Sequence, residues 1–235
     1  MSRATMTARA AELPRAPIYG IGCYKVGSAR YDFEIGWPEV ERDVAWARAA
    51  LTAAGIQAGD SVLFTVAQCE APWLSPMLRA ARELRVTCLI SEVFGFDAGR
   101  SAWFLQAFPV KAVVGLGVDT VDGWLQKGLS PAELLAGVDI VWARPNALGK
   151  LKEVGSRVAP MAIVGPALAL GRPGERGATV NPAEWLLHDE DGLITVTSVG
   201  ERAASFVNAP TGVSGTVEDS EDGAQSLSVN EVAVT

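Results

Sequence analysis

The sequence predicts an α/β fold: a doubly wound, mostly parallel sheet of about five strands with a small C-terminal antiparallel β subdomain. Three observations predict it. Helical patterns alternate with short apolar runs between residues 38 and 166. Those runs lack polar alternation, as expected of strands that are covered on both faces. From residue 184 onward the pattern changes to short β-rich pieces separated by turn signals.

The first predicted helix begins at Pro38, because proline suits the first helical position. Its apolar residues recur at spacings of three and four and so share one face; they are Val40, Val44, Ala47 and Leu51. Gly55 follows, placed to adopt the left-handed conformation that ends a helix.

Five apolar runs are the predicted parallel strands: 62–67, 86–91, 111–116, 138–142 and 160–165. Helical patterns lie between and after them at 72–85, 97–108, 120–126 with 131–135, and 145–154. Ser130 and Glu133 have the spacing of a capping box at one of these helix starts. Gly115 and Gly117 fit a plain strand-to-helix turn better than a dinucleotide loop, since residue 120 is Thr in place of the third glycine.

The segment 167–182 is rich in glycine and proline and is expected to be a long loop. The β-rich pieces after it are 184–188, 193–198, 204–208, 212–218 and 226–234. Asp191-Gly192 between two of them is a strong hairpin signal.

The composition excludes several classes of protein. The net charge is −7 and the 20 basic residues are scattered, which argues against a nucleic-acid partner. No apolar run approaches the roughly 20 residues that cross a bilayer, so we expect no membrane partner. Residues 1–17 contain no continuous apolar segment, and we expect no secretory signal.

The cysteines and the single histidine suggest neither a disulfide framework nor a metal site. Cys23, Cys69 and Cys88 lie far apart without Cys-x-x-Cys spacing, which is typical of a reducing compartment. We therefore expect a cytoplasmic protein. His188 alone cannot build a histidine-rich zinc site, and we assign no metal ligand.

Residues 54–63, AGIQAGDSVL, resemble a segment of the acyl-adenylate-forming (AMP-binding) superfamily, and most closely its phenylacetate-CoA ligase branch. Three later segments are similar to that branch in the same order. Residues 143–148 stand at a Pro-Ser helix start, 163–168 at the adenine-facing turn, and 192–198 at a strand of the β subdomain. The resemblance implies an AMP-forming carboxylate–CoA ligase that uses ATP, Mg²⁺ and CoA.

The motifs that this chemistry needs are missing from their places. Residues 19–37 should hold the phosphate loop, but they contain no Ser-Gly-Thr-Thr-Gly run. Lys25 and Ser28 could touch a phosphate there, and a surface loop is the alternative. No aromatic-Gly-x-Thr-Glu motif follows residue 165, where Glu175 and Glu184 are the carboxylates before Asp189. Val213 replaces the ribose-binding aspartate, and the C-terminal domain has no counterpart.

We therefore expect a truncated, degenerate relative of these ligases. Its predicted parts are an N-terminal tail with a degenerate phosphate-loop region (1–36), an α/β domain (37–170) and a β-rich subdomain (171–235). ATP, Mg²⁺ and CoA are implied by the resemblance while their motifs are missing, so the cofactor is left unassigned.

The predicted ligand-binding residues follow strand ends. Gln68, Trp73, Glu92 and Phe94 come just after the first two strands, and ligands bind at the carboxyl edge of open parallel sheets. Gly165-Pro166 stands at the adenine-facing turn of the resembling family. An apolar pocket with one or two polar groups suits an acyl or aryl ligand. No catalytic residue is assigned.

Three functions follow from the sequence. The first is a protein that binds an acyl or aryl carboxylate or a CoA thioester without autonomous adenylation. The second is a non-catalytic interaction subunit, either a homo-oligomer or a partner of a true enzyme. The third is an AMP-forming ligase completed by another chain.

Overall fold

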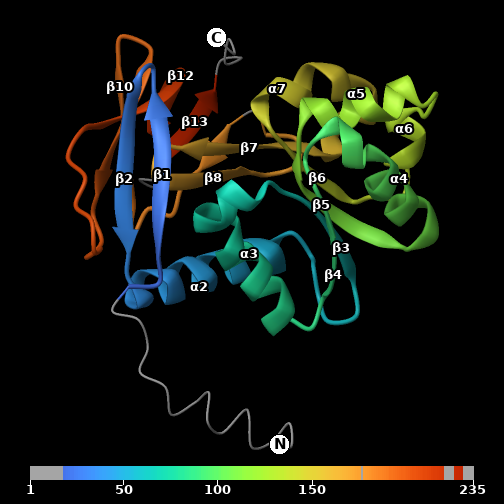
Figure 1. The fold of residues 1–235 in the computed structure, drawn as a ribbon, viewed down its shortest axis with the longest axis horizontal. Coiled ribbons are helices and arrows are strands. Elements are labelled where there is room, and N and C mark those ends of the chain that lie inside the picture. The colour runs from blue at the N-terminus through green and yellow to red at the C-terminus, as the bar shows by residue number, and fades with distance from the viewer. Residues whose placement is uncertain (1–17, 176, 220–224, 230–235) are drawn as a thin grey trace, which may run out of the picture.

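We describe the protein from a computed structural model, which describes residues 18–175, 177–219 and 225–229. Its main element is a mixed sheet of eleven strands, with a separate two-stranded hairpin beside it (Figure 1). The strand order is β10-β11-β12-β13-β9-β8-β7-β6-β5-β3-β4. The α/β class predicted from the sequence is confirmed.

The five predicted parallel strands all form and lie side by side. They are β3 (Ser61–Thr65), β4 (Thr87–Ser91), β5 (Val110–Leu116), β6 (Ile140–Ala143) and β7 (Val158–Val164). Their four pairings are parallel, in the order β7-β6-β5-β3-β4. All residues of β3 and β6 are buried, which explains why these runs show no polar alternation.

Helices cover both faces of this parallel part. They are α2 (Trp37–Ala53), α3 (Ala71–Glu83), α4 (Ala98–Ala107), α5 (Val118–Gln126), α6 (Pro131–Leu134) and α7 (Pro145–Leu148), with short 3₁₀ helices η1 (Gln68–Glu70), η2 (Gly95–Asp97) and η3 (Gly149–Arg157). Leu51 and Met77, from α2 and α3, pack with Phe64 on one face. Ala102 and Trp124, from α4 and α5, share a core with other residues of the sheet on the other face. The doubly wound arrangement is therefore confirmed for this part.

The sheet is larger and more antiparallel than predicted. It continues from β7 into β8 (Ala167–Gly171), β9 (Ala178–Thr179), β13 (Gln225–Val229), β12 (Ala209–Asp219), β11 (Leu193–Ser198) and β10 (Trp185–Glu190). Six of its ten pairings are antiparallel. The prediction of about five mostly parallel strands is wrong in extent, because the β-rich segment is hydrogen-bonded onto the parallel strands as one sheet.

Strand β8 contradicts the long loop predicted at 167–182. All five of its residues, ALALG, are buried, and they pair antiparallel with β7. The chain reverses at Gly165-Pro166, where Gly165 has a φ of +57°. The glycine- and proline-rich composition belongs to the residues after Gly171, so averaging over the whole segment hid the strand.

The β-rich pieces are mostly where the sequence predicts them. Residues 204–208 are the exception and form no strand. Asp191 and Gly192 have φ values of +53° and +78° and join β10 to β11, so the predicted hairpin is confirmed. Residues 230–234 of the last predicted piece lie outside the described residues.

Residues 20–35 form a hairpin where a loop was expected. Strands β1 (Gly20–Val26) and β2 (Ala29–Ile35) pair antiparallel from Gly20↔Ile35 to Val26↔Ala29. Phe33 and Ile35 are buried two residues apart, a period of two that was the missed strand signal. The hairpin packs against β12 through β1 (Figure 1).

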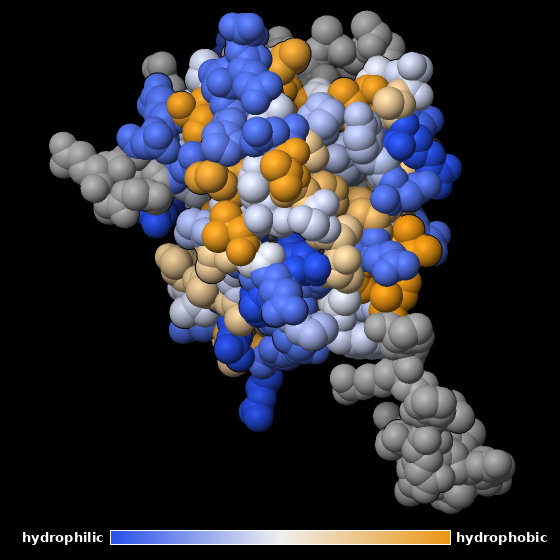
Figure 2. Space-filling view, turned by 90° about the vertical axis from the view of Figure 1, so that its left-hand side faces the viewer, coloured by the Kyte–Doolittle hydropathy of each residue, from blue (hydrophilic) through white to orange (hydrophobic). Residues whose placement is uncertain are grey.

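The face that the hairpin shares with the C-terminal strands is chemically mixed. Hydrophobic residues on it are broken up by hydrophilic ones (Figure 2). None of the described helices is both long and apolar enough to span a membrane.

Candidate functional site

The carboxyl ends of β3, β5 and β6 form the edge on which the sequence places the ligand. The chain leaves β3 toward β4 on one side and then returns to β5 on the other side of β3. Such a reversal of strand order is a topological switch point, where open α/β sheets form their ligand crevice.

An ion pair fills this switch point. Arg144, the residue after β6, makes a bidentate contact with the Glu70 carboxylate, with Nη2 2.8 Å from Oε2. Its Nε donates to the carbonyl oxygen of Gly115 at 2.9 Å. Both side chains are mostly buried, at 16% and 14% exposure. The guanidinium and the carboxylate therefore neutralise each other inside the crevice.

Gly115 allows this close packing. Its φ is +87°, and a Cβ at this position would lie 2.5 Å from the carbonyl oxygen of Thr65. Sequence reasoning took Gly115 as part of a plain turn and missed Glu70 and Arg144. They are 74 residues apart in the chain, and no local pattern connects them.

The β1–β2 hairpin ends beside β12 in a turn of two residues, Gly27 and Ser28. Lys25 and Ser28, the two groups predicted to reach a phosphate, are exposed. A Cβ on Gly212 would lie 3.1 Å from the Lys25 carbonyl oxygen, so the end of the hairpin packs closely on β12. The turn is too short to wrap around a phosphate chain.

Aromatic side chains fill the space under the β7–β8 turn. Trp73 donates its indole N–H to the Gly165 carbonyl oxygen at 3.0 Å, and the Tyr24 ring packs against Gly165. Phe33 lies between Tyr24, 6.1 Å away, and Trp73, 6.2 Å away. The remaining cavity, which Trp73 and Pro166 both line, is about 30 Å³, room for only about two waters.

The Tyr24 hydroxyl is buried and has no hydrogen-bond partner among the described residues. Burial, with a smaller contribution from Tyr31, raises the pKa of Tyr24 to about 12. The phenol therefore stays neutral at physiological pH.

The six predicted ligand-binding residues fall into three places. Trp73, Gly165 and Pro166 lie together at the small aromatic-lined cavity. Gln68 is exposed and lines a separate apolar groove of about 130 Å³ between α3 and the β3–β4 edge. Glu92 and Phe94 follow β4, where the Glu92 N–H donates to Asp97 and the Phe94 ring stacks on Phe96 at 5.7 Å.

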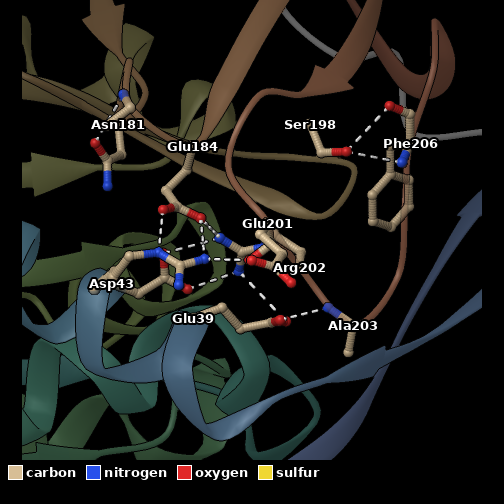
Figure 3. Close-up of polar contacts among 11 residues, drawn as sticks. Glu39, Asp43, Asn181, Glu184, Ser198, Glu201, Arg202, Ala203 and Phe206 are labelled. Carbon is tan, nitrogen blue, oxygen red and sulfur yellow. Dashed lines mark hydrogen bonds and ion pairs between the residues drawn. The ribbon is translucent and has the colours of Figure 1, made fainter.

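A cluster of buried charges lies at the other end of α2 from Gly55 (Figure 3). Glu184 accepts from Arg42 at 2.5 Å and from Arg202 at 2.6 Å. Arg202 also donates to Asp43 at 2.8 Å, and its guanidinium lies 4.4 Å from the centre of the Trp185 ring. Sequence reasoning missed this cluster, because its members come from α2 and from residues that lie 142 to 164 positions later in the chain.

Glu39 completes the cluster by accepting the Ala203 N–H at 2.7 Å. Burial raises the pKa of Asp43, and the hydrogen bonds from Arg202 only partly offset that effect. The cluster therefore fixes the 201–203 turn on α2. Glu39, Glu184 and Arg202 are almost completely removed from water, while Arg42 is 39% exposed.

Comparison with known proteins gives a match in structure alone. No protein-family model matches the sequence, and no curated protein matches it significantly. A 2-hydroxyisobutyryl-CoA ligase, solved in an open conformation with 2-HIB-AMP and CoA, is 15% identical over 95% of this chain and 60% of its own, with a TM-score of 0.64. The chain has the fold of the acyl-adenylate-forming ligases.

Two further solved structures share this ligase fold. The amide bond synthetase McbA from Marinactinospora thermotolerans is 11% identical over 90% of this chain and 48% of its own, with a TM-score of 0.58. A double mutant of o-succinylbenzoate CoA synthetase from Bacillus subtilis is 11% identical over 89% of this chain and 48% of its own, with a TM-score of 0.61. This chain thus spans about half the length of the structures it matches.

Within the ligase fold, Glu184 is the buried carboxylate closest in sequence to the position where the resemblance places a magnesium ligand. Both of its oxygens are held by Arg42 and Arg202. Glu175 is exposed and lies 3.8 Å from Arg172. Among the described residues, no group of three or more His, Cys, Asp or Glu side chains could hold a metal ion.

Proposed function

We propose that this chain binds an acyl or aryl carboxylate, or its CoA thioester, and does not adenylate the acid on its own. The two-residue turn at Gly27-Ser28 is the observation that carries this proposal. It occupies the segment before α2 where the resemblance places the phosphate loop.

The loss of adenylation follows from the charge that the reaction must stabilise. Attack of a carboxylate on the α-phosphorus of ATP needs cations and N–H donors held around the phosphates. Loss of one such donor costs about 10²–10³ in rate. In this chain the hairpin offers no cradle, Glu184 is paired with arginines, and the Arg144 charge is paired with Glu70.

Retained binding is supported by the fold itself. The matched 2-hydroxyisobutyryl-CoA ligase was solved with an acyl-adenylate and CoA, and the resemblance to the phenylacetate-CoA ligase branch favours an aryl acid. On sequence grounds the ligand lies at the carboxyl edge of the sheet. There the groove beside Gln68 offers about 130 Å³ between Phe64, Leu74 and Ile90.

Two measurements test the proposal. ATP–pyrophosphate exchange with a panel of carboxylic acids should stay at background. Thermal scans against ATP, CoA, acyl-CoA and the acids should show stabilisation by a carboxylate or thioester and none by ATP. A ligand at 100 times its Kd adds about 2.7 kcal/mol of stability. Exchange above background, or the absence of a shift with every carboxylate and thioester, contradicts the proposal.

A second candidate function, a non-catalytic interaction subunit, is favoured by the exposed edge of the sheet at β4. This strand, TCLIS, ends the sheet and carries no charge or proline, the usual protections of an edge. Phe94, Phe96 and Trp103 nearby are 41%, 80% and 55% exposed.

Analytical sedimentation of the wild-type chain and of the Ile90→Lys variant tests this function. A dimer that Ile90→Lys dissociates supports it, and a monomer at high concentration overturns its homo-oligomeric form.

A further inference from the structure

A cavity larger than those at the predicted edge lies under the C-terminal half of α2. It measures about 340 Å³, within the range of small-molecule sites, against 30 Å³ and 130 Å³ at the edge. One wall is the end of α2 with Ala49, Ala50 and Ala53, together with Ala54, which follows the helix. The other wall comes from the sheet, where Ile140 begins β6 and Gly171 ends β8. The cavity therefore lies at the amino end of the parallel strands, opposite the switch point.

The walls of this cavity are aromatic and aliphatic. Trp46 of α2 and Trp142 of β6 both line it. The Trp142 N–H already donates to the Gly171 carbonyl oxygen at 2.9 Å, so this indole presents its ring without an unsatisfied polar atom. Opposite Trp142, the alanine side chains at the end of α2 are too small to fill the space, which stays open. A flat apolar group fits such a space.

One cation lines the cavity, and it is loosely held. Arg172 follows β8 with 80% of its side chain exposed, and among the described residues it forms an ion pair with Glu175 at 3.8 Å. An exposed ion pair at this distance contributes little. The guanidinium can exchange Glu175 for a ligand carboxylate, which it can bind with two parallel hydrogen bonds.

Trp46 connects this cavity to the residues predicted from the sequence. It also lines the small cleft that Trp73 and Pro166 share, on the other side along α2. Its ring therefore separates the open cavity from that cleft. A ligand in the open cavity would contact Trp46 where the cavity borders that cleft.

We propose that an aromatic carboxylate binds in the cavity beneath α2, with its ring against Trp46 and Trp142 and its carboxylate on Arg172. This proposal rests on the proposed function for the class of ligand and names a different place for it. The edge groove at Gln68 has less than half the volume and includes no arginine or lysine among its lining residues.

The test compares alanine-to-tryptophan substitutions that fill one space at a time. Titration calorimetry and thermal scans with 2-naphthoate are run on the wild-type chain and three variants. Ala53→Trp fills the α2 cavity, Ala71→Trp fills the edge groove, and Ala45→Trp adds the same group at an exposed position that lines neither space. We expect binding to be lost only in Ala53→Trp. Arg172→Gln should weaken 2-naphthoate about tenfold and leave the neutral 2-naphthamide unchanged.

Each outcome separates this proposal from the proposed function. Binding that survives Ala53→Trp and is lost in Ala71→Trp places the ligand at the edge, which overturns the α2 cavity and keeps the function. No binding of any aryl or acyl carboxylate or CoA ester to the wild type overturns both. A measurement without mutations guards against misfolding of a variant: NOEs between 2-naphthoate protons and the methyls of Ala50 and Ala53. NOEs to other methyls in place of these overturn the α2 cavity.

Discussion

Arg202 joins segments that lie far apart in the sequence. It contacts Glu184 at 2.6 Å and Asp43 at 2.8 Å, and only 6% of its side chain is exposed. Loss of Arg202 would leave the buried carboxylate of Glu184 and the mostly buried carboxylate of Asp43 without this partner. That unpaired buried charge, more than the lost ion-pair energy, is what makes removal of the arginine costly.

We therefore expect Arg202→Met to lower the free energy of unfolding by about 3–5 kcal/mol. Arg30→Met is the matched control, because the Arg30–Asp32 pair is 64% and 51% exposed and should contribute less than about 1 kcal/mol. Urea unfolding followed by tryptophan fluorescence measures both values. Equal losses in the two variants would contradict the structural role of the Arg202 cluster.

Tyr24 gives a prediction in alkaline solution. Its folded-state pKa of about 12 lies above the ordinary value of 10, because burial disfavours the phenolate. The unfolded chain therefore releases this proton more readily. The stability that the neutral phenol contributes is complete below pH 10 and is lost as the pH rises toward 12.

Tyr24→Phe should remove this part of the pH dependence. At pH 7 the variant should be as stable as the wild type or slightly more so, since the hydroxyl is buried without a partner. The measurement is urea unfolding at several values between pH 7 and pH 11. A large loss of stability at pH 7 would show that the hydroxyl has a partner that the described residues do not include.

At the scale of the elements, the accuracy of the sequence prediction follows from burial. Strands β3 and β6 are buried along their whole length, so their apolar runs are visible without any context. Strand β2 alternates Tyr31, Phe33 and Ile35, a signal that its glycine-rich neighbourhood obscured. Strand β8 was missed because its five apolar residues precede a segment of glycine and proline.

The candidate site was less predictable than the elements, because it is made by pairs that only the fold brings together. Trp73 and Gly165 were both predicted, but their hydrogen bond spans 92 residues. The Arg144–Glu70 pair spans 74 residues, and neither residue belongs to a local sequence motif that would point to the other. Charge alone could not identify it, since other arginines in the chain lie in exposed pairs.

The irregularity at Gly115, near the end of β5, gives the prediction at this scale. Gly115→Ala places a methyl group 2.5 Å from the Thr65 carbonyl oxygen at a φ of +87° and pushes on the Arg144 guanidinium. We expect a loss of about 1–3 kcal/mol from the strained backbone, with a further loss from the overpacked contact. Gly137→Ala is the control, because a Cβ added at Gly137 would meet no other part of the structure within 4 Å. Chemical denaturation of the two variants measures the difference, and similar midpoints would contradict the close β3–β5 packing.

At the scale of the whole molecule, the parallel and antiparallel parts of the large sheet are joined in two ways. Strand β7 pairs parallel with β6 on one side and antiparallel with β8 on the other, so hydrogen bonding continues across the boundary. The charged cluster joins α2, which covers the parallel strands, to Glu184 and Arg202 near the antiparallel ones. Neither part can lose its structure without exposing residues that belong to the other.

We therefore expect the described parts to unfold in one cooperative transition. Trp124 and Trp142 report on the parallel part and Trp185 on the antiparallel part, while far-ultraviolet circular dichroism follows the helices of the parallel part. Urea curves from the two probes should coincide, which is the test of two-state behaviour. Arg202→Met should move both curves together, because Arg202 acts on both parts at once. A fluorescence curve with two transitions, only one of which coincides with the circular dichroism curve, would mean that the antiparallel strands fold independently of the helices.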